Sequence, residues 1–280
     1  MVTNWIYNLI NYPDDYLPQA TIYEARKIFR DRLCTEIEAK TFDDILITQM
    51  RYVFNLSDDI HFFVPHSSKS STLQYTTCDQ WTTIVEKNIS ICSKIKRNPF
   101  KFPFIMHFVY FKFPDSENIL IELPITTEFL DMTAAISRVL SRSGAHLVIC
   151  SPIGSGFEEA LYVASTNLHI KVFTPQTNNI YNLNEFYNDL KIIMQAAALE
   201  DLESVFFINH AWITTQPDIL KPIEAILEGS DIPDLFGEDL EAVANPLRNA
   251  AQMEGYQESL ASYFLKRKLN NLIIFYMNNK

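Results

Sequence analysis

The segment from His146 to Ala164, HLVICSPIGSGFEEALYVA, decides the fold class. It predicts a buried strand over His146–Cys150, then a loop with two glycines, then a helix. This order is typical of a phosphate-binding loop, in which glycines let backbone N–H groups surround a phosphate at the positive end of a helix. The segment therefore predicts a candidate ligand loop at the carboxyl end of a strand.

The loop has the shape of this motif without its chemistry. In the pattern G-x-x-x-x-G-K-[ST], Gly156 is the second glycine and Ser151 replaces the first. Phe157 replaces the phosphate-binding lysine, and Glu158 replaces the magnesium-binding hydroxyl and would repel a phosphate. The sequence leaves open a nucleotide site that has lost its function or an ordinary glycine turn. The candidate residues are Ser151, Gly154, Ser155, Gly156, Phe157 and Glu158.

Composition indicates a folded protein with one large domain or two ordinary ones. The chain has 280 residues, of which 48% are hydrophobic and 20% are charged. Its net charge of −11 argues against a nucleic-acid partner, because such surfaces are basic. The short basic run Lys94–Lys101 is followed by apolar residues and does not change this expectation.

The cysteines and the apolar runs exclude further classes. The four cysteines have no C-x-x-C spacing and are expected to be free thiols in a reducing compartment. The N-terminus is neither basic nor continuously apolar, which predicts no signal peptide. The longest apolar run, Phe102–Phe113, is too short to span a bilayer, which needs about 20 residues, so no membrane partner is expected. The cysteines are Cys34, Cys78, Cys92 and Cys150.

The first part of the chain, residues 1–93, is predicted to be helical. Apolar spacing predicts helices over Thr21–Ala39, Phe42–Phe54 and Thr82–Ser93. Residues 55–80 are polar and predict a loop. The polar face of the first of these helices is expected to face solvent. That face comprises Glu24, Arg26, Lys27, Arg30, Asp31 and Arg32.

Residues 94–116 differ in composition from everything around them, because they are dense in Phe, Lys and Pro. We interpret them as an insertion, which could be an irregular hairpin, poorly ordered chain or a wrongly predicted exon.

The remainder, residues 117–280, alternates helices with strands and predicts a parallel sheet with helices on both faces. Asn182 and Glu185 predict a capping box. The domain ends on a strand that has nothing to cover it, so a C-terminal truncation is expected. The expected helices are Thr127–Ser141, one that opens at Asn182, one with Pro217 just inside its start and Gly229 just past its end, and about Glu238–Met253 and Tyr256–Asn270. The expected further strands are His169–Phe173, Ser204–Asn209 and Leu272–Met277.

Several stretches in this order resemble the dynein heavy chain family, and most closely the cytoplasmic dynein of intraflagellar transport. They are IYEARKIFRDRL (Ile22–Leu33), FLDMTAAISRVLSRSGAHLVI (Phe129–Ile149), IYNLNEFYNDLKIIMQAAALED (Ile180–Asp201) and ILEGSDIPDLFGEDLEAV (Ile226–Val243). The resemblance implies a helical lid of the third AAA+ module over 1–93 and the large α/β subdomain of the fourth over 117–280. Residues 94–116 have no counterpart in the family.

The resemblance also implies where the acidic motif that holds magnesium and activates water should lie. It falls on His210 and Ala211 of FFINHAW, or, shifted by one residue, on Asn209 and His210. Neither register supplies a carboxylate. We therefore expect no catalytic residues, no metal site, no enzymatic activity of this fragment, and at most weak binding of ATP or ADP.

The function implied by the resemblance is a structural and coupling role in the AAA+ motor ring that drives minus-end-directed transport on microtubules, here retrograde intraflagellar transport. Implied partners are the neighbouring AAA+ modules of the same heavy chain and, through the parent complex, the intermediate and light intermediate chains and microtubules. The implied location is the cytoplasm, the cytoskeleton and the cilium. A nucleotide-binding regulatory module that does not hydrolyse, and a remnant without a motor role, stay open as alternatives.

Overall fold

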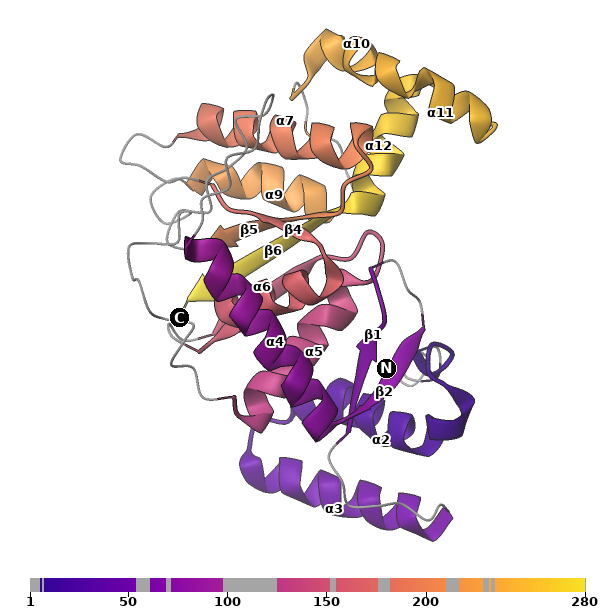
Figure 1. Cartoon of the computed structure of the whole chain (residues 1–280), viewed down its shortest axis with the longest axis vertical. Helices are drawn as coiled ribbons and strands as arrows, with labels where there is room; N and C mark the ends of the chain where they lie inside the picture. Colours follow the sequence, from indigo (N-terminus) through magenta and orange to yellow (C-terminus); the bar gives the residue numbers. More distant parts are fainter. Residues whose placement is uncertain are drawn as a thin grey trace.

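The computed structural model has a parallel sheet with helices on both faces, joined to an N-terminal group of helices and a hairpin (Figure 1). It describes residues 6, 8–53, 61–68, 72–97, 125–151, 155–175, 182–209, 217–228, 232 and 235–279. The described α-helices are α2 (Leu17–Ile28), α3 (Glu36–Val53), α4 (Cys78–Arg97), α5 (Thr127–Leu140), α6 (Phe157–Leu168), α7 (Leu183–Leu199), α9 (Leu220–Leu227), α10 (Leu240–Ala244), α11 (Arg248–Met253) and α12 (Leu260–Asn271). The strands are β1 (His61–Pro65), β2 (Leu73–Thr77), β3 (Leu147–Ser151), β4 (Lys171–Phe173), β5 (Ser204–Asn209) and β6 (Leu272–Asn279). Short 3-10 helices are η1 (Asp14–Tyr16), η2 (Arg30–Arg32), η4 (Pro217–Ile219), η5 (Gly237–Asp239) and η6 (Asn245–Leu247).

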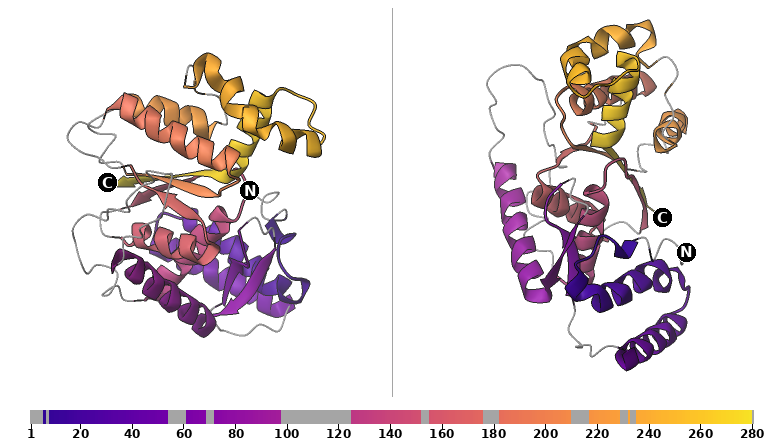
Figure 2. Two further views of the ribbon diagram at one scale, coloured as in Figure 1. Left: turned by 45° about the horizontal axis from the view of Figure 1, so that its top comes forward. Right: turned by 90° about the vertical axis from the view of Figure 1, so that its right-hand side faces the viewer.

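The larger described sheet is parallel throughout and has the strand order β3-β6-β5-β4, which confirms the predicted α/β class. From β3 the chain passes through α6 to β4, at the far edge of the described sheet. It then returns toward β3 one strand at a time, first to β5 and then to β6. Parallel crossovers are right-handed, so a reversal of direction places the connecting helices on opposite faces. Accordingly α6 lies with α4 and α5 below the sheet, while α7 and α9 lie above it (Figures 1 and 2).

Separate hydrophobic clusters fill the two faces. On one face, side chains of α4, α5 and α6 pack against the sheet, and on the other face α7 and α9 do so. Burying apolar side chains in this way stabilises the fold by about 25 cal/mol per Å² of apolar surface removed from water. The largest buried members of the first cluster are Trp81, Leu140, Leu161, Phe207 and Phe275, and those of the second are Phe186, Leu190, Phe206 and Ile274.

The strand before the glycine loop lies at the edge of the described sheet, so its prediction as a buried strand was wrong. Val148 is 51% exposed, and Cys150 is exposed as well. The last strand, β6, is an inner strand of the described sheet instead. β6 pairs with β3 on one side and β5 on the other, and it is therefore covered, contrary to the prediction. Short apolar runs alone do not specify which strand is central.

A hairpin lies within residues 55–80, where a loop was predicted. β1 and β2 pair antiparallel, with Phe63 opposite Tyr75, and Phe63 is fully buried. Helix α4 then begins at Cys78 rather than at Thr82, because Thr77 and Gln80 exchange hydrogen bonds as a capping pair.

The helix predicted over Thr21–Ala39 is two helices. α2 ends at Ile28 and α3 begins at Glu36, so the predicted start at Phe42 was wrong as well. Thr35 explains the new start, because its Oγ1 accepts from the backbone N–H of Glu38 and donates to the Glu38 carboxylate.

Proline and a serine cap divide the last helices differently from the prediction. Pro246 lies in η6, between α10 and α11, where a continuous helix was expected. α12 begins at Leu260, after Ser259, whose hydroxyl accepts from the backbone N–H of Ser262. The capping box of Asn182 and Glu185 at the start of α7 is confirmed.

The N-terminal part shares a core with the α/β part. Trp81 on α4 is fully buried, and its Nε1 donates a 2.9 Å hydrogen bond to the backbone oxygen of Leu130 on α5. Phe62 and Val64 of β1 join the same cluster. The division at residue 93 stays a prediction, and of the segment 94–116 the structure describes only residues 94–97, which continue α4.

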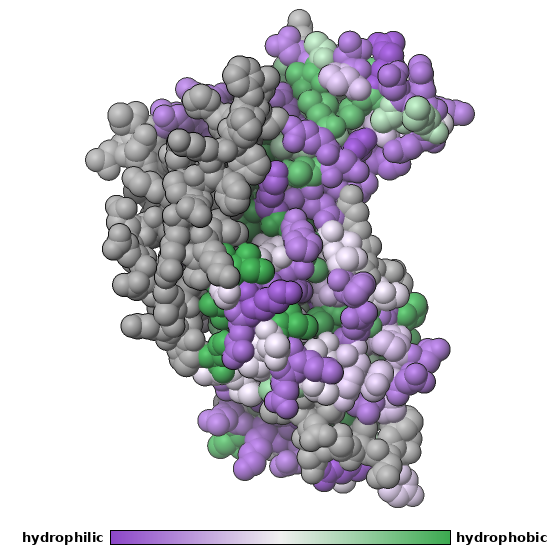
Figure 3. All heavy atoms as spheres, viewed as in Figure 1, coloured by the Kyte–Doolittle hydropathy of each residue, from purple (hydrophilic) through white to green (hydrophobic). Residues whose placement is uncertain are grey.

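Among the described residues on the face seen in Figure 3, hydrophilic side chains predominate, and hydrophobic side chains form small separate groups. On α3, large apolar side chains are exposed. They are Ile37, Ile45 and Tyr52. Scattered exposed apolar residues of this kind are normal for protein surfaces.

Candidate functional site

The predicted glycine loop follows β3 at the carboxyl edge of the sheet, where parallel α/β folds bind ligands. Ser151 ends β3, and Phe157 begins α6. The candidate Gly154 lies outside the described residues, whereas the structure places Ser151, Ser155, Gly156, Phe157 and Glu158 together at this edge.

Gly156 has the backbone conformation that requires glycine. Its φ is +85°, which is left-handed, and it is the N-cap of α6. Its carbonyl accepts the first helical bond from Ala160, at 2.9 Å. A Cβ built on it would contact the Phe129 ring of α5 at 3.7 Å, an ordinary contact, so the constraint is conformational rather than steric. Gly156 thus forms the left-handed turn into α6 that both interpretations of the loop allow, and the Phe129 ring of α5 lies beside it.

The two serines of the loop bond to each other. Ser155 Oγ donates to Ser151 Oγ at 3.0 Å, and Ser151 is buried. This bond ties the end of β3 to the residue before Gly156 and occupies the hydroxyl proton of Ser155.

Phe157 and Glu158 give the start of α6 an apolar and acidic character. Phe157 packs against the hydrophobic cluster below the sheet. Burial raises the pKa of Glu158, and the neighbouring Glu159 raises it further. No side chain caps α6, so its first backbone N–H groups are directed at the loop, but two carboxylates stand in the same turn. The described part of this site can therefore offer amide donors but no cation.

The predicted acidic motif lies outside the described residues, since His210 and Ala211 are not described. Asn209, in the alternative register, is the last residue of β5 and pairs with Met277 of β6. Two other histidines have structural positions. His146 Nδ1 accepts from the backbone N–H of Ile274, and burial and then Lys268 lower its pKa, while His169 ends α6 in a left-handed conformation.

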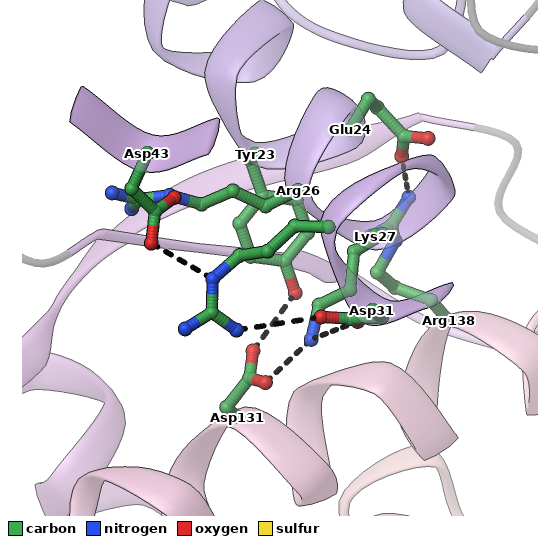
Figure 4. Close-up of polar contacts among 9 residues, drawn as sticks. Tyr23, Glu24, Arg26, Lys27, Asp31, Asp43, Asp131 and Arg138 are labelled. Carbon is green, nitrogen blue, oxygen red and sulfur yellow. Dashed lines mark hydrogen bonds and ion pairs between the residues drawn. The ribbon is translucent and has the colours of Figure 1, made fainter. Parts of the chain in front are cut away.

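The sequence analysis missed a polar cluster between α2 and α5. Glu24, predicted to face solvent, is 1% exposed and pairs with Arg138, so that prediction was wrong (Figure 4). Lys27 pairs with Asp131 of α5. The available signal was Arg138 in the last turn of the apolar helix Thr127–Ser141, because a buried arginine requires a partner.

Arg26 and Arg30 of the same charge run also have partners. Each Nε donates to Asp43 of α3 at 2.8 Å, which fixes α2 against α3. These groups are partly exposed, so the pairs are weaker than the buried one.

Within the described residues no three His, Cys, Asp or Glu side chains converge as a metal site. Over the same residues, no helix has the length and apolar character that crossing a bilayer requires. The four cysteines are unpaired.

Comparison with known proteins places these features in a family. Residues 121–280 match the family described as P-loop containing dynein motor region D4. The chain is 27% identical to cytoplasmic dynein 2 heavy chain 1 of Tripneustes gratilla over 295 aligned residues, which cover 100% of this chain and 7% of the relative. It is 26% identical to the Homo sapiens protein of the same name, covering 98% and 6%. Against the cytoplasmic dynein heavy chain of Dictyostelium discoideum it is 27% identical over 58% of this chain and 4% of the relative. The chain thus spans less than a tenth of the length of these relatives.

Proposed function

The chain belongs to the P-loop-containing dynein motor region D4 family, and we propose that it is a structural and coupling part of the motor ring whose own nucleotide site is degenerate. The observation that carries this proposal is the start of α6. Phe157, at the position of the phosphate-binding lysine, is partly buried against the hydrophobic cluster, and the adjacent Glu158 adds a carboxylate where a phosphate would arrive. An anion at this helix terminus would meet charge of its own sign.

Turnover is not expected from this chain. Water activation in P-loop enzymes needs a carboxylate and a bound magnesium ion at the end of the third strand. The sequence supplies His210 and Ala211, or Asn209 and His210, at that position. Phosphate release by the purified chain should stay at background at several protein concentrations. Release that scales with protein and persists through further purification would contradict the proposal.

Nucleotide binding is the sharper test. We expect at most weak binding of ATP–magnesium by the unmodified chain in titration calorimetry. Phe157→Lys alone leaves Glu158, which can pair with the new ammonium, and Glu158→Thr alone leaves no cation. The double variant should therefore gain more affinity than the two single gains combined.

Two controls keep that test specific. Phe157→Met removes the ring without adding a charge, and Glu159→Thr removes a carboxylate one residue further on. Neither should bind ATP more tightly than the unmodified chain. The unfolding temperature of every variant is measured first, because Phe157 packs against the core. If the gain in ATP affinity of the double variant only equals the sum of the two single gains, the proposal that the loop has lost its phosphate site is contradicted.

The second candidate function is a regulatory module that holds ATP or ADP without hydrolysis. It is supported by the uncapped N-terminus of α6 and the left-handed Gly156, since phosphate contacts in such loops are made by backbone amides. Micromolar binding of ADP by the unmodified chain would favour this function over the first.

Within a whole heavy chain, we infer that the partners are the neighbouring AAA+ modules, with intermediate and light intermediate chains and microtubules reached through the complex. Residues 1–93 would serve as the lid of the preceding module. The relatives named cytoplasmic dynein 2 heavy chain 1 support placement in the cytoskeleton and the cilium, in retrograde intraflagellar transport. A tagged full-length chain that stays out of cilia would contradict that placement.

A further inference from the structure

A buried ion pair joins α2 to α5 (Figure 4), and two aromatic rings lie near its arginine. Glu24 of α2 is 1% exposed and Arg138 of α5 is 9% exposed. We call the set of Glu24, Arg138, Tyr12 and Tyr23 the interhelix latch. None of these residues belongs to the candidate loop.

Every partner of the Glu24 carboxylate is a donor. Asn8 Nδ2 donates to it at 2.8 Å, and the Tyr12 hydroxyl and Arg138 Nη2 donate to its other oxygen. Burial alone would raise the pKa of Glu24, but Arg138 and these hydrogen bonds lower it below its ordinary value. The carboxylate is therefore ionised at neutral pH.

The guanidinium of Arg138 also lies near the rings of Tyr12 and Tyr23. Its Cζ lies 5.0 Å from the centroid of the Tyr23 ring and 5.6 Å from that of Tyr12. A cation over aromatic rings and beside a carboxylate is stabilised by both contacts. The latch thus fixes both the position and the orientation of the Arg138 side chain.

A second, more exposed pair fixes the rotation of α5. Lys27 Nζ donates to Asp131 at 2.5 Å, and the Tyr23 hydroxyl donates to the other oxygen of Asp131 at 3.5 Å. Asp131 and Arg138 lie seven residues apart, which is about two helical turns, so they are on one face of α5. α2 is therefore bound to α5 by two ion pairs.

The other face of α5 supports the glycine loop. The Phe129 ring lies against Gly156, and α5 packs along α6 in the shared cluster. Arg138 is nine residues beyond Phe129 on the same continuous helix, a distance of roughly 13 Å at 1.5 Å per residue. A displacement of the latch would move Phe129 with it, because an α-helix transmits motion along its length.

We propose that Arg138 is a positioning residue that holds the glycine loop and the start of α6 in place through α5, so that movement of α2 is coupled to the loop. What Arg138 controls is the conformation of the loop. This rests on the proposed function, because that function makes the loop the candidate site. Loss of the latch would release Phe129 from Gly156 and loosen the first turns of α6.

Hydrogen exchange of the 280-residue chain tests this inference without any ligand, so its outcome is independent of nucleotide binding. We compare the unmodified chain with Glu24→Gln, and with Asp43→Asn as the matched control that breaks the α2–α3 pairs only. In Glu24→Gln, exchange of the amides of Ala160 to Ala164 should rise at least tenfold. In Asp43→Asn it should stay within twofold.

Two further variants separate positioning from general destabilisation. Arg138→Lys keeps the charge but loses the planar group that lies over the rings, and it should give an intermediate rise at the start of α6. Glu24→Gln with Arg138→Gln removes both buried charges and should restore at least half of the lost protection. The inference is overturned if the rise is confined to α2, if it is equal in every helix including α7, or if Arg138→Lys leaves α6 unchanged. Should Glu24→Gln not fold, the Arg138→Lys comparison decides alone.

Discussion

A buried glutamate and a half-buried glutamate of this molecule are in opposite situations. Glu24 in the latch has a carboxylate with three donors and a pKa below its ordinary value, whereas Glu158 at the loop has an acidic neighbour and a pKa above it. Burial by itself would raise the pKa of both carboxyl groups. The difference teaches that partners, not burial, decide whether a carboxylate stabilises the fold.

The largest effect on stability is expected when the partner of Glu24 is removed. Arg138→Met leaves the carboxylate buried and without its cation, and we expect the free energy of unfolding to fall by about 3–5 kcal/mol. Urea denaturation measures the loss. Adding Glu24→Leu in the same chain should recover most of it, since replacing both members of a buried pair is close to neutral. A double variant as unstable as the single one would show that the pair is not the cause.

The loop can be tested through its backbone as well. Gly156→Ala forces an alanine to φ +85°, and we expect a loss of about 1–2 kcal/mol in thermal unfolding. Gly156→Asn should lose less, because asparagine tolerates left-handed conformations. Equal stability of the alanine variant and the unmodified chain would mean that the loop adopts another conformation.

The pH dependence should have opposite signs at the two glutamates. Glu158 has a raised pKa, so its contribution is complete below about 4.5 and is lost as pH rises through its folded value. Glu158→Gln should therefore match the unmodified chain at pH 4 and be more stable at pH 7, by under about 1 kcal/mol because the positive end of α6 offsets part of the penalty.

Glu24 has a lowered pKa, so its contribution is present above about 4.5 and is lost as pH falls through its folded value. The deficit of Glu24→Gln should accordingly shrink on acidification. Denaturation at a series of pH values checks both glutamates. If the stability difference from the unmodified chain changed with pH in the same direction for both variants, the proposed difference between the two glutamates would be wrong.

The smallest effect is expected on the solvent side of α2. Asp43→Asn removes the partner of Arg26 and Arg30, which are partly exposed, and should lower the free energy of unfolding by about 0.5 kcal/mol. The loss should decrease in high salt. A loss comparable to that of Arg138→Met would show that exposure does not separate the two sets of pairs.

The sequence predicted the features that depend on local order. The alternation of strands and helices after residue 117, the capping box at Asn182 and the turn at Gly156 follow from neighbouring residues, and the structure confirms them. The hairpin β1–β2 was missed because its strands are stabilised by pairing with each other and by packing of Phe63, neither of which is local.

The site was predicted in part for the same reason. The positions of Ser151, Ser155, Phe157 and Glu158 follow from one short motif, and the structure brings them to one sheet edge. The latch joins α2 to a helix more than a hundred residues away in the chain, and helical periodicity says that Glu24 is polar without saying what it meets.

The bond from Trp81 to the backbone of Leu130 gives the molecule an intrinsic optical reporter of α5. A fully buried indole beside a fixed carbonyl emits at short wavelength, and its emission shifts to the red when the helix withdraws and water enters. The chain has three tryptophans, so replacing Trp5 and Trp212 with phenylalanine would leave this signal alone. Movements of α5 would then be visible in milliseconds, in a stopped-flow cuvette, without a label.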